Sequence, residues 1–196
     1  NTSDHTGGAA IAALRLLKAL RQEGVDATLL CRDRSLPPER TDVVSLKPSP
    51  WLKVKFALER LEIYLRNGCS REGLFAVDTA RMGNDITRLP EFKEADVIHL
   101  HWTNHARLSL SNLQQILQSG KRVVWTMHDM WPFTGVCHNS DDCTRWLTGC
   151  GQCPQLRKPA HRDLSAQTYA RKQTAYAAGR FTAVGCSQWL AGLASQ

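Results

Sequence analysis

Residues 97–127 read VIHLHWTNHARLSLSNLQQILQSGKRVVWTM, and this stretch decides the fold. It begins with Val97–Trp102, a near-continuous apolar run with two histidines, which is typical of a strand buried on both faces. It ends with Val123–Met127, which reads as a second buried strand. Between them, apolar residues recur at helical spacing before Gly120: Leu110, Leu113, Ile116 and Leu117. A strand, a helix and a strand in this order predict a βαβ unit with parallel strands and a right-handed crossover.

The same alternation of helices and strands extends to both ends of the chain. The further elements that we predict are a helix from Gly8 to Gly24, strands at Val25–Leu30 and Asp42–Leu46, a helix from Asp163 or Ser165 to about Ala178, a strand at Phe181–Gly185 and a last helix capped by Ser187. The sequence therefore predicts an α/β fold, a Rossmann-like parallel sheet with helices on both faces.

The first eight residues, NTSDHTGG, form a polar loop that leads directly into a helix. Such a loop normally follows a strand, and no strand precedes it in this sequence. We therefore expect the chain to begin inside a βαβ unit, with the first strand of the sheet missing. We expect residues 1–196 to form one domain, with the cysteine-rich residues 131–160 as an insertion within it.

Another amphipathic helix is predicted between residues 51 and 66. Its apolar residues follow helical spacing: Trp51, Val54, Leu58, Leu61 and Leu65. Basic residues flank this stripe: Lys53, Lys55, Arg60 and Arg66. We expect the stripe to pack against the core, as such stripes usually do. The apolar face is unusually wide, however, and this also fits contact with a membrane or a partner.

The composition limits the classes of protein that fit. The chain has 196 residues, 42% of them apolar, and a net charge of +7. Its longest unbroken apolar run, Ala9–Leu14, is far shorter than the roughly 20 residues that span a bilayer, and no signal peptide is visible. We expect a soluble cytoplasmic protein. Residues 144–196 hold seven basic residues against Asp163 alone, so the excess charge is local and fits a solvated face, an anionic lipid or a phosphate-bearing ligand.

Gly7 and Gly8 stand at the start of the first helix. Backbone N–H groups at a helix N-terminus, with no Cβ in the way, can bind an anion. A plain tight turn is the alternative explanation for this pair. The pair does not form the G-x-G-x-x-G motif, so the sequence does not favour nicotinamide binding.

His128 and Asp129 follow the strand at 123–127. In an open parallel sheet, ligands bind outside the carboxyl ends of the strands, so we predict these two as working residues. A neutral or charged histidine there can donate to a sugar or phosphate oxygen. The alternative is that His128 is a core residue and Asp129 caps a turn. His99 and His101 lie on one face of their strand. The simpler explanation for this pair is burial with hydrogen bonds. The alternative is that the two histidines bind a metal, as in metal-dependent hydrolases.

Four cysteines fall within seventeen positions: Cys137, Cys143, Cys150 and Cys153. In a chain without export signals this favours a metal over disulfides, and Cys150-Gly-Gln-Cys153 resembles half of a zinc knuckle. Four thiolates would leave no open position, so the predicted zinc is structural. His138 is an alternative ligand, and disulfides stay open. The three other cysteines are expected to be small core residues: Cys31, Cys69 and Cys186.

The run VVWTMHDMWPFTGVCHNSDDCTRWLTGCGQCPQL at residues 123–156 resembles the N-terminal half of bacterial family-four glycosyltransferases. So do three other stretches: NTSDHTGGAAIAALRLLKAL at 1–20, ADVIHLHW at 95–102 and TAVGCSQWLAGLA at 182–194. The resemblance implies the GT-B architecture, in which two Rossmann-type domains face each other across a cleft. It implies that this chain is the N-terminal, acceptor-side domain, and that transfer needs no catalytic metal.

By the same resemblance, Gly7 and Gly8 approach the donor diphosphate and the acceptor. His128 lies against the transferred sugar, and Asp129 orients it. The family's E-x7-E motif, which grips the donor, is absent here, so the donor-binding domain would have to follow Gln196. We therefore expect this chain by itself to be inactive.

The resemblance implies a retaining glycosyltransferase of the hexosyltransferase type. It would move a sugar from a nucleotide-sugar to a glycan or lipid-linked acceptor in polysaccharide or cell-envelope biosynthesis, in the cytoplasm or on the inner face of the cytoplasmic membrane. The sequence leaves two alternatives open. One is the metal-dependent hydrolase, which would use His99, His101, His128 and Asp129. The other is a zinc-stabilised module whose basic tail binds protein or nucleic acid; aromatic residues are sparse there, so we expect no nucleic-acid partner.

Overall fold

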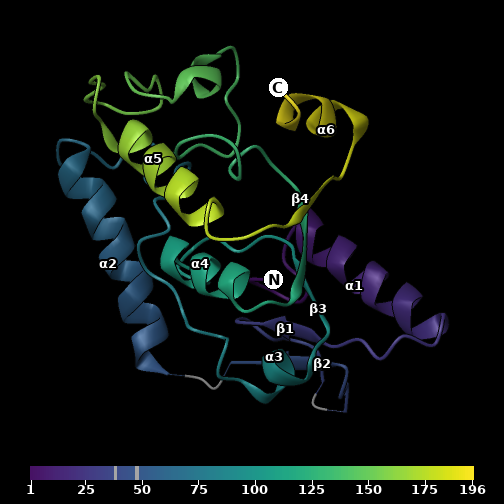
Figure 1. Ribbon diagram of the computed structural model, residues 1–196. Coiled ribbons are helices and arrows are strands. Elements are labelled where there is room, and N and C mark those ends of the chain that lie inside the picture. Colours follow the sequence, from purple (N-terminus) through teal and green to yellow (C-terminus); the bar gives the residue numbers. More distant parts are fainter. Residues whose placement is uncertain (38, 47–48) are drawn as a thin grey trace.

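The computed structural model describes residues 1–37, 39–46 and 49–196. Five strands form two parallel sheets (Figure 1). The first pairs β1 (Leu29–Cys31) with β2 (Val43–Ser45), and the second has the order β3 (Val97–Leu100), β4 (Arg122–Met127), β5 (Thr182–Gly185). All these pairs are parallel, which confirms the α/β prediction and the βαβ unit at 97–127.

Residues 1–4 lie between the two sheets and connect them. The Thr2 amide donates to the carbonyl of Trp102 just beyond β3, at 3.0 Å, and the Asp4 amide donates to the carbonyl of Asp33 just beyond β1, at 3.1 Å. Ser3 and Asp33 also form a parallel bridge. The carboxyl ends of β1 and β3 and the loop that leads into the first helix therefore meet at one edge.

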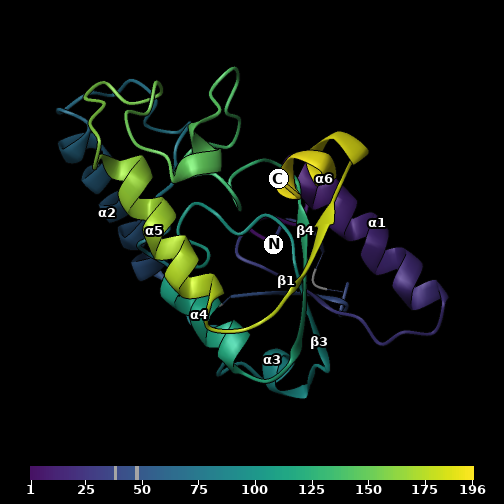
Figure 2. The ribbon, with the colours of Figure 1, turned by 45° about the horizontal axis from the view of Figure 1, so that its top comes forward.

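Helices cover both faces of the larger sheet. Figures 1 and 2 show α1 (Gly8–Gln22) and α6 (Gln188–Ala194) on one side, and α4 (Leu110–Gln118) and α5 (Leu164–Tyr176) on the other. The predicted caps are present: Asp163 accepts from the amides of Ser165 and Ala166, and Ser187 accepts from that of Leu190. The remaining short helices are α3 (Pro90–Glu94) and the 3₁₀ turn η1 (Arg145–Thr148).

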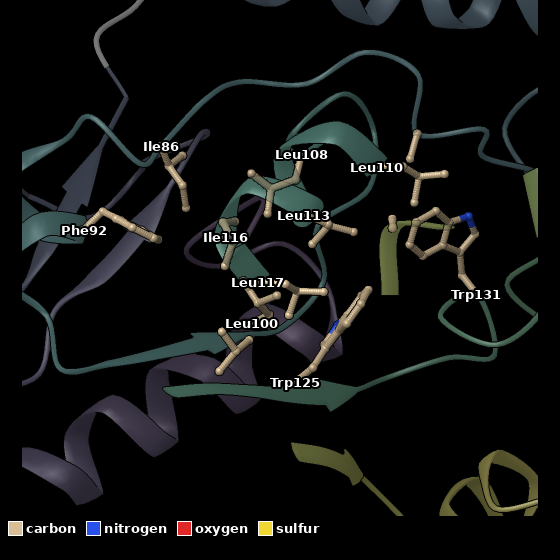
Figure 3. Packing of buried hydrophobic residues seen from close by; sticks show 13 residues of the cluster. Ile86, Phe92, Leu100, Leu108, Leu110, Leu113, Ile116, Leu117, Trp125 and Trp131 are labelled. Carbon is tan, nitrogen blue, oxygen red and sulfur yellow. The ribbon is translucent and has the colours of Figure 1, made fainter. Parts of the chain in front are cut away.

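The main core lies between α4 and the sheet (Figure 3). Leu113 and Ile116 of α4 pack there with Trp125 of β4, and all three are at most 3% exposed. The indole N–H of Trp125 donates to the carbonyl of His101 at 3.0 Å, so the largest core side chain also fixes the backbone at the end of β3. Burial of large apolar groups in this layer holds the sheet edge where the polar residues gather.

Several predictions at single positions were wrong. Val97 is 46% exposed, because it lies at the outer end of an edge strand, so β3 is not buried on both faces. The strand predicted from Val25 begins only at Leu29. Cys31 is buried as expected, but Cys69 and Cys186 are exposed and are not core residues.

Helix α2 (Pro50–Arg66) forms where it was predicted, but with its apolar stripe outward. All five stripe residues are exposed: Trp51, Val54, Leu58, Leu61 and Leu65. The buried residues of α2 are instead Glu59, Arg60 and Ile63. The expected core packing of the stripe was therefore wrong, because an internal ion network, not apolar contact, holds most of the inner face. Of the helices in the described ranges, none is long and apolar enough to cross a membrane.

Candidate active site

Three histidines stack at the carboxyl ends of β3 and β4. His99 and His101 lie two residues apart on one strand face, with ring centroids 4.5 Å apart. His128 follows β4 and its Nε2 lies 3.0 Å from Nδ1 of His101, in a hydrogen bond between the two rings. His99 bonds through Nε2 to the hydroxyl of Thr126 at 2.8 Å. The structure therefore brings the predicted histidines together and makes His101 the partner that orients His128.

This histidine stack is electrically neutral at pH 7. Burial lowers the pKa of His99 and His128 below the ordinary value of 6.5 and that of His101 to about 3. Nε2 of His128 is used by His101, and within the described residues no hydrogen bond occupies its Nδ1, which can therefore bind a ligand. Depending on which ring donates in the shared hydrogen bond, that Nδ1 is a donor or an acceptor, and both suit a sugar hydroxyl.

Asp129 belongs to a second group of side chains. Its carboxylate accepts from the indole of Trp102 at 2.8 Å, from Nδ1 of His138 at 2.7 Å and from the amide of Trp131 at 2.9 Å. Within the described residues no hydrogen bond joins Asp129 to His128. The orienting role implied for Asp129 is therefore filled by His101, and Asp129 positions Trp102 and His138.

His138 is held between two carboxylates. Its Nε2 donates to Asp78 at 2.9 Å while Nδ1 donates to Asp129. Burial opposes a charge on this ring, but the two carboxylates outweigh it and raise the pKa of His138 to about 9. Both ring nitrogens of His138, the alternative metal ligand, are bonded to carboxylates. The ring is a fixed cation beside Trp102, with ring centroids 5.6 Å apart.

The second carboxylate, Asp78, is the residue that the sequence reasoning missed. It is fully buried and also pairs with Arg60 of α2, which donates to the carbonyls of Leu74 and Val77 as well. Burial works against ionisation, yet the hydrogen bond from His138 and the charge of Arg60 hold the pKa of Asp78 below its ordinary value. No local motif marks Asp78, because its partners lie 18 and 60 residues away.

The glycine pair stands open beside this edge. Figures 1 and 2 show the start of α1 next to the carboxyl end of β4. Gly7 has φ 86°, a left-handed conformation that favours glycine, and no side chain caps the helix. A Cβ added at Gly7 or Gly8 would meet no atom within 4 Å, so neighbouring atoms do not crowd these two positions at the start of the helix. An anion can therefore approach them closely.

The predicted metal ligands are not already set around a metal position. Across the described ranges, no group of three or more His, Cys, Asp or Glu side chains is set to hold a metal ion. The hydrolase arrangement is not assembled, because His101 and His128 bond to each other while Asp129 is taken by Trp102 and His138. All seven cysteines are unpaired in the described structure.

Comparison with known proteins decides the family. The profile described as Glycosyltransferase Family 4 matches residues 6–186, which is most of the chain and includes the histidine stack, Asp78, His138 and the glycine pair. The chain belongs to this family.

One curated relative is named "Putative colanic acid biosynthesis glycosyl transferase WcaC" and comes from Escherichia coli strain K12. It is 33% identical over 98 residues, which are 46% of this chain and 24% of the relative, so the chain spans about a quarter of that protein's length. No solved structure gives a significant match.

Proposed function

We propose that the protein is a retaining glycosyltransferase that moves a sugar from a nucleotide-sugar to a glycan or lipid-linked acceptor, and that this chain supplies the acceptor-side domain. The observation that carries the proposal is that the start of α1 lies next to the carboxyl end of β4 (Figures 1 and 2), the strand that His128 directly follows, and that His128 is bonded to His101 through Nε2. The histidine suits a sugar hydroxyl and the start of the helix suits a phosphate. Membership of glycosyltransferase family 4 and the colanic acid role in the name of WcaC support polysaccharide synthesis.

The chemistry follows from charge. Breaking the anomeric bond leaves an oxocarbenium-like sugar and an anionic diphosphate, and the amides of the first turn of α1 stabilise that anion. The Nδ1 of His128 binds a hydroxyl of the transferred sugar and fixes its orientation relative to the acceptor. A neutral ring suits this role, because a cation there would oppose positive charge developing at the anomeric carbon.

The charged His138 has a positioning role and does not contact the sugar. Two carboxylates balance the charge of the His138 ring, and its side chain is 20% exposed. His138 acts through Asp129, which accepts from the indole of Trp102 and holds it in one orientation. Trp102 then offers a fixed aromatic surface on which a sugar ring can stack. We regard Asp78, Asp129 and His138 as positioning residues.

A direct test is donor turnover by the protein produced from its complete gene. The purified protein is incubated with uridine- and guanosine-diphosphate sugars and an extract of lipid-linked glycans, and nucleoside diphosphate release is measured together with the mass of the product. We expect acceptor-dependent release, and an anomeric coupling in the product that matches the donor. Inverted configuration would refute retention, and absence of any turnover across the donors would refute the transferase role.

We further propose that the exposed face of α2 binds an anionic membrane, where a lipid-linked acceptor resides. The five stripe residues are exposed, as is Phe75 at 63%, and the exposed Lys53 flanks the stripe, whereas Arg66 is bonded to Glu62 and Gln167. Apolar residues flanked by a basic one match a surface that buries side chains in the interface while pairing with lipid phosphates. Lys55 and Arg60 are bound internally and take no part.

Flotation with phosphatidylglycerol-containing vesicles tests this face. We expect the protein to float with them, and Leu58→Ser with Leu61→Ser to abolish flotation. Trp189→Ser is the matched control, because Trp189 is 64% exposed on α6, on another side of the molecule. If the wild-type protein does not float, or if it dimerises in solution through this face, the membrane proposal is wrong.

A further inference from the structure

We infer that the four cysteines of the insertion hold one structural zinc ion, a site separate from the proposed transfer chemistry. Cys137, Cys143, Cys150 and Cys153 all line one small cavity of about 20 Å³, which Trp146 and Val136 help to close. A water molecule needs roughly 10–15 Å³ of such space, so the cavity accommodates a single small occupant. Four cysteine side chains around one ion-sized space are the ligand set of a closed zinc site.

The backbone is arranged to direct the last two cysteines to that cavity. Residues 149–152 form a run of positive φ angles, of which Cys150 (64°) and Gln152 (47°) are not glycines. Such a conformation is costly for ordinary residues and persists only where the surroundings fix it. Here the amide of Gly151 donates to the Ser165 hydroxyl and that of Cys153 to the Asp163 carboxylate, at 3.0 and 2.8 Å, so the turn is fastened to the start of α5.

A buried lysine near these cysteines is consistent with the inference. Lys172 of α5 is 1% exposed and donates to the carbonyls of Trp131, Thr134 and Gly135. Within the described ranges, no carboxylate lies at salt-bridge distance from its ammonium group, although buried charges are normally paired. Its ammonium also lies 3.6 Å from the centroid of the Trp131 ring, and a zinc ion with four thiolates, of net charge −2, would add negative charge near it.

The bonding balances without a further reactant. Four thiols each release one proton to solvent and the four sulfurs donate to Zn²⁺, with Zn–S distances of about 2.3 Å. No redox change occurs. Since no three ligating side chains are yet set for a metal, the sulfurs would turn toward the cavity by side-chain rotation as the ion binds. With four protein ligands no position is open, so the ion would hold the loop, and with it His138 next to Cys137.

Metal content and cobalt spectroscopy of the complete protein test the site. Purified under reducing conditions and given zinc, it should retain about one ion per chain after dialysis. Cobalt substitution should produce the absorption bands of a tetrahedral thiolate site, which needs no variant to fold. Cys153→Ser should lower zinc affinity by at least about tenfold, whereas Cys186→Ser, at an exposed cysteine outside the cavity, should not change it.

Three results would overturn the inference. The first is wild-type protein that is fully reduced yet binds neither zinc nor cobalt. The second is a set of disulfides among the four cysteines, detected by alkylation and mass measurement without reductant. The third is an equal loss of affinity in the Cys186→Ser control. None of these results bears on sugar transfer, which the donor assay measures separately.

Discussion

Replacing Arg60 with Met should destabilise the protein severely, because Arg60 neutralises the buried end of the polar network. Its side chain is 7% exposed and pairs with Asp78 and Glu59, while also donating to the carbonyls of Leu74 and Val77. Methionine fills similar space along α2 but offers no donor. Asp78 would keep His138 as its only charged hydrogen-bonding partner, and two carbonyls would lose theirs.

The expected loss follows from these contacts. Removing one member of a buried ion pair costs about 3–5 kcal/mol, because the remaining charge stays buried without its partner. We therefore expect Arg60→Met to lower the free energy of unfolding by about 3–5 kcal/mol. Arg66→Met on the same helix is the matched control: Arg66 is partly exposed and pairs with Glu62, so its loss should cost under about 1 kcal/mol.

Urea unfolding followed by tryptophan fluorescence and circular dichroism measures both variants against the wild-type protein. The double variant Arg60→Met with Asp78→Asn separates the pair from simple packing, since it removes both charges. We expect the double variant to be less destabilised than the sum of the two single changes. Equal losses in Arg60→Met and Arg66→Met, or strictly additive losses in the double variant, would refute the assignment of Arg60 to a buried charge network.

Three further outcomes can be measured. His128→Ala should lower kcat/KM for sugar transfer by about 30- to 1,000-fold, equivalent to about 2–4 kcal/mol, and the exposed His161→Ala should not; unchanged turnover would remove His128 from the site. Because burial lowers the pKa of His128, the His128-dependent part of kcat/KM should stay level from pH 8 down through 6.5 and fall only below it; a fall centred above 6.5 would contradict the neutral ring. Leu113→Ala should cost about 3–5 kcal/mol in urea unfolding, since Leu113 is 1% exposed in the main core, whereas a loss below 1 kcal/mol would mean that α4 packs elsewhere.

The fold was predictable where local signals agree with the tertiary structure. The unit at 97–127 was found because its apolar residues repeat at helical spacing between two apolar runs. Helix α2 was also found, but its orientation was not. An apolar stripe normally marks the buried side, and only the pairing of Arg60 with Asp78 reverses it. That pairing joins two segments 18 residues apart with no motif at either end.

Some residues of the candidate site were also predictable from the sequence, and their partners were not. His128 and Asp129 were predicted because the ends of parallel strands are where ligands bind. The partner of each was not, since His101 reaches His128 across the sheet and His138 returns to Asp129 from the cysteine-rich loop. Asp78 had no signal at all. Hydrogen bonds between residues far apart in the chain follow from the register of the strands, and single-sequence patterns do not contain that register.

The contacts of Arg60 also connect helix α2 with the indole of Trp102. An unbroken series of hydrogen bonds runs from Arg60 through Asp78, His138 and Asp129 to the indole of Trp102. Arg60 lies on the inner side of the helix whose outer side is apolar and exposed. A rigid shift of α2 therefore either breaks the first link or pulls on every later one. The orientation of one tryptophan at the edge of the sheet is therefore tied, through four consecutive hydrogen bonds, to the position of that helix.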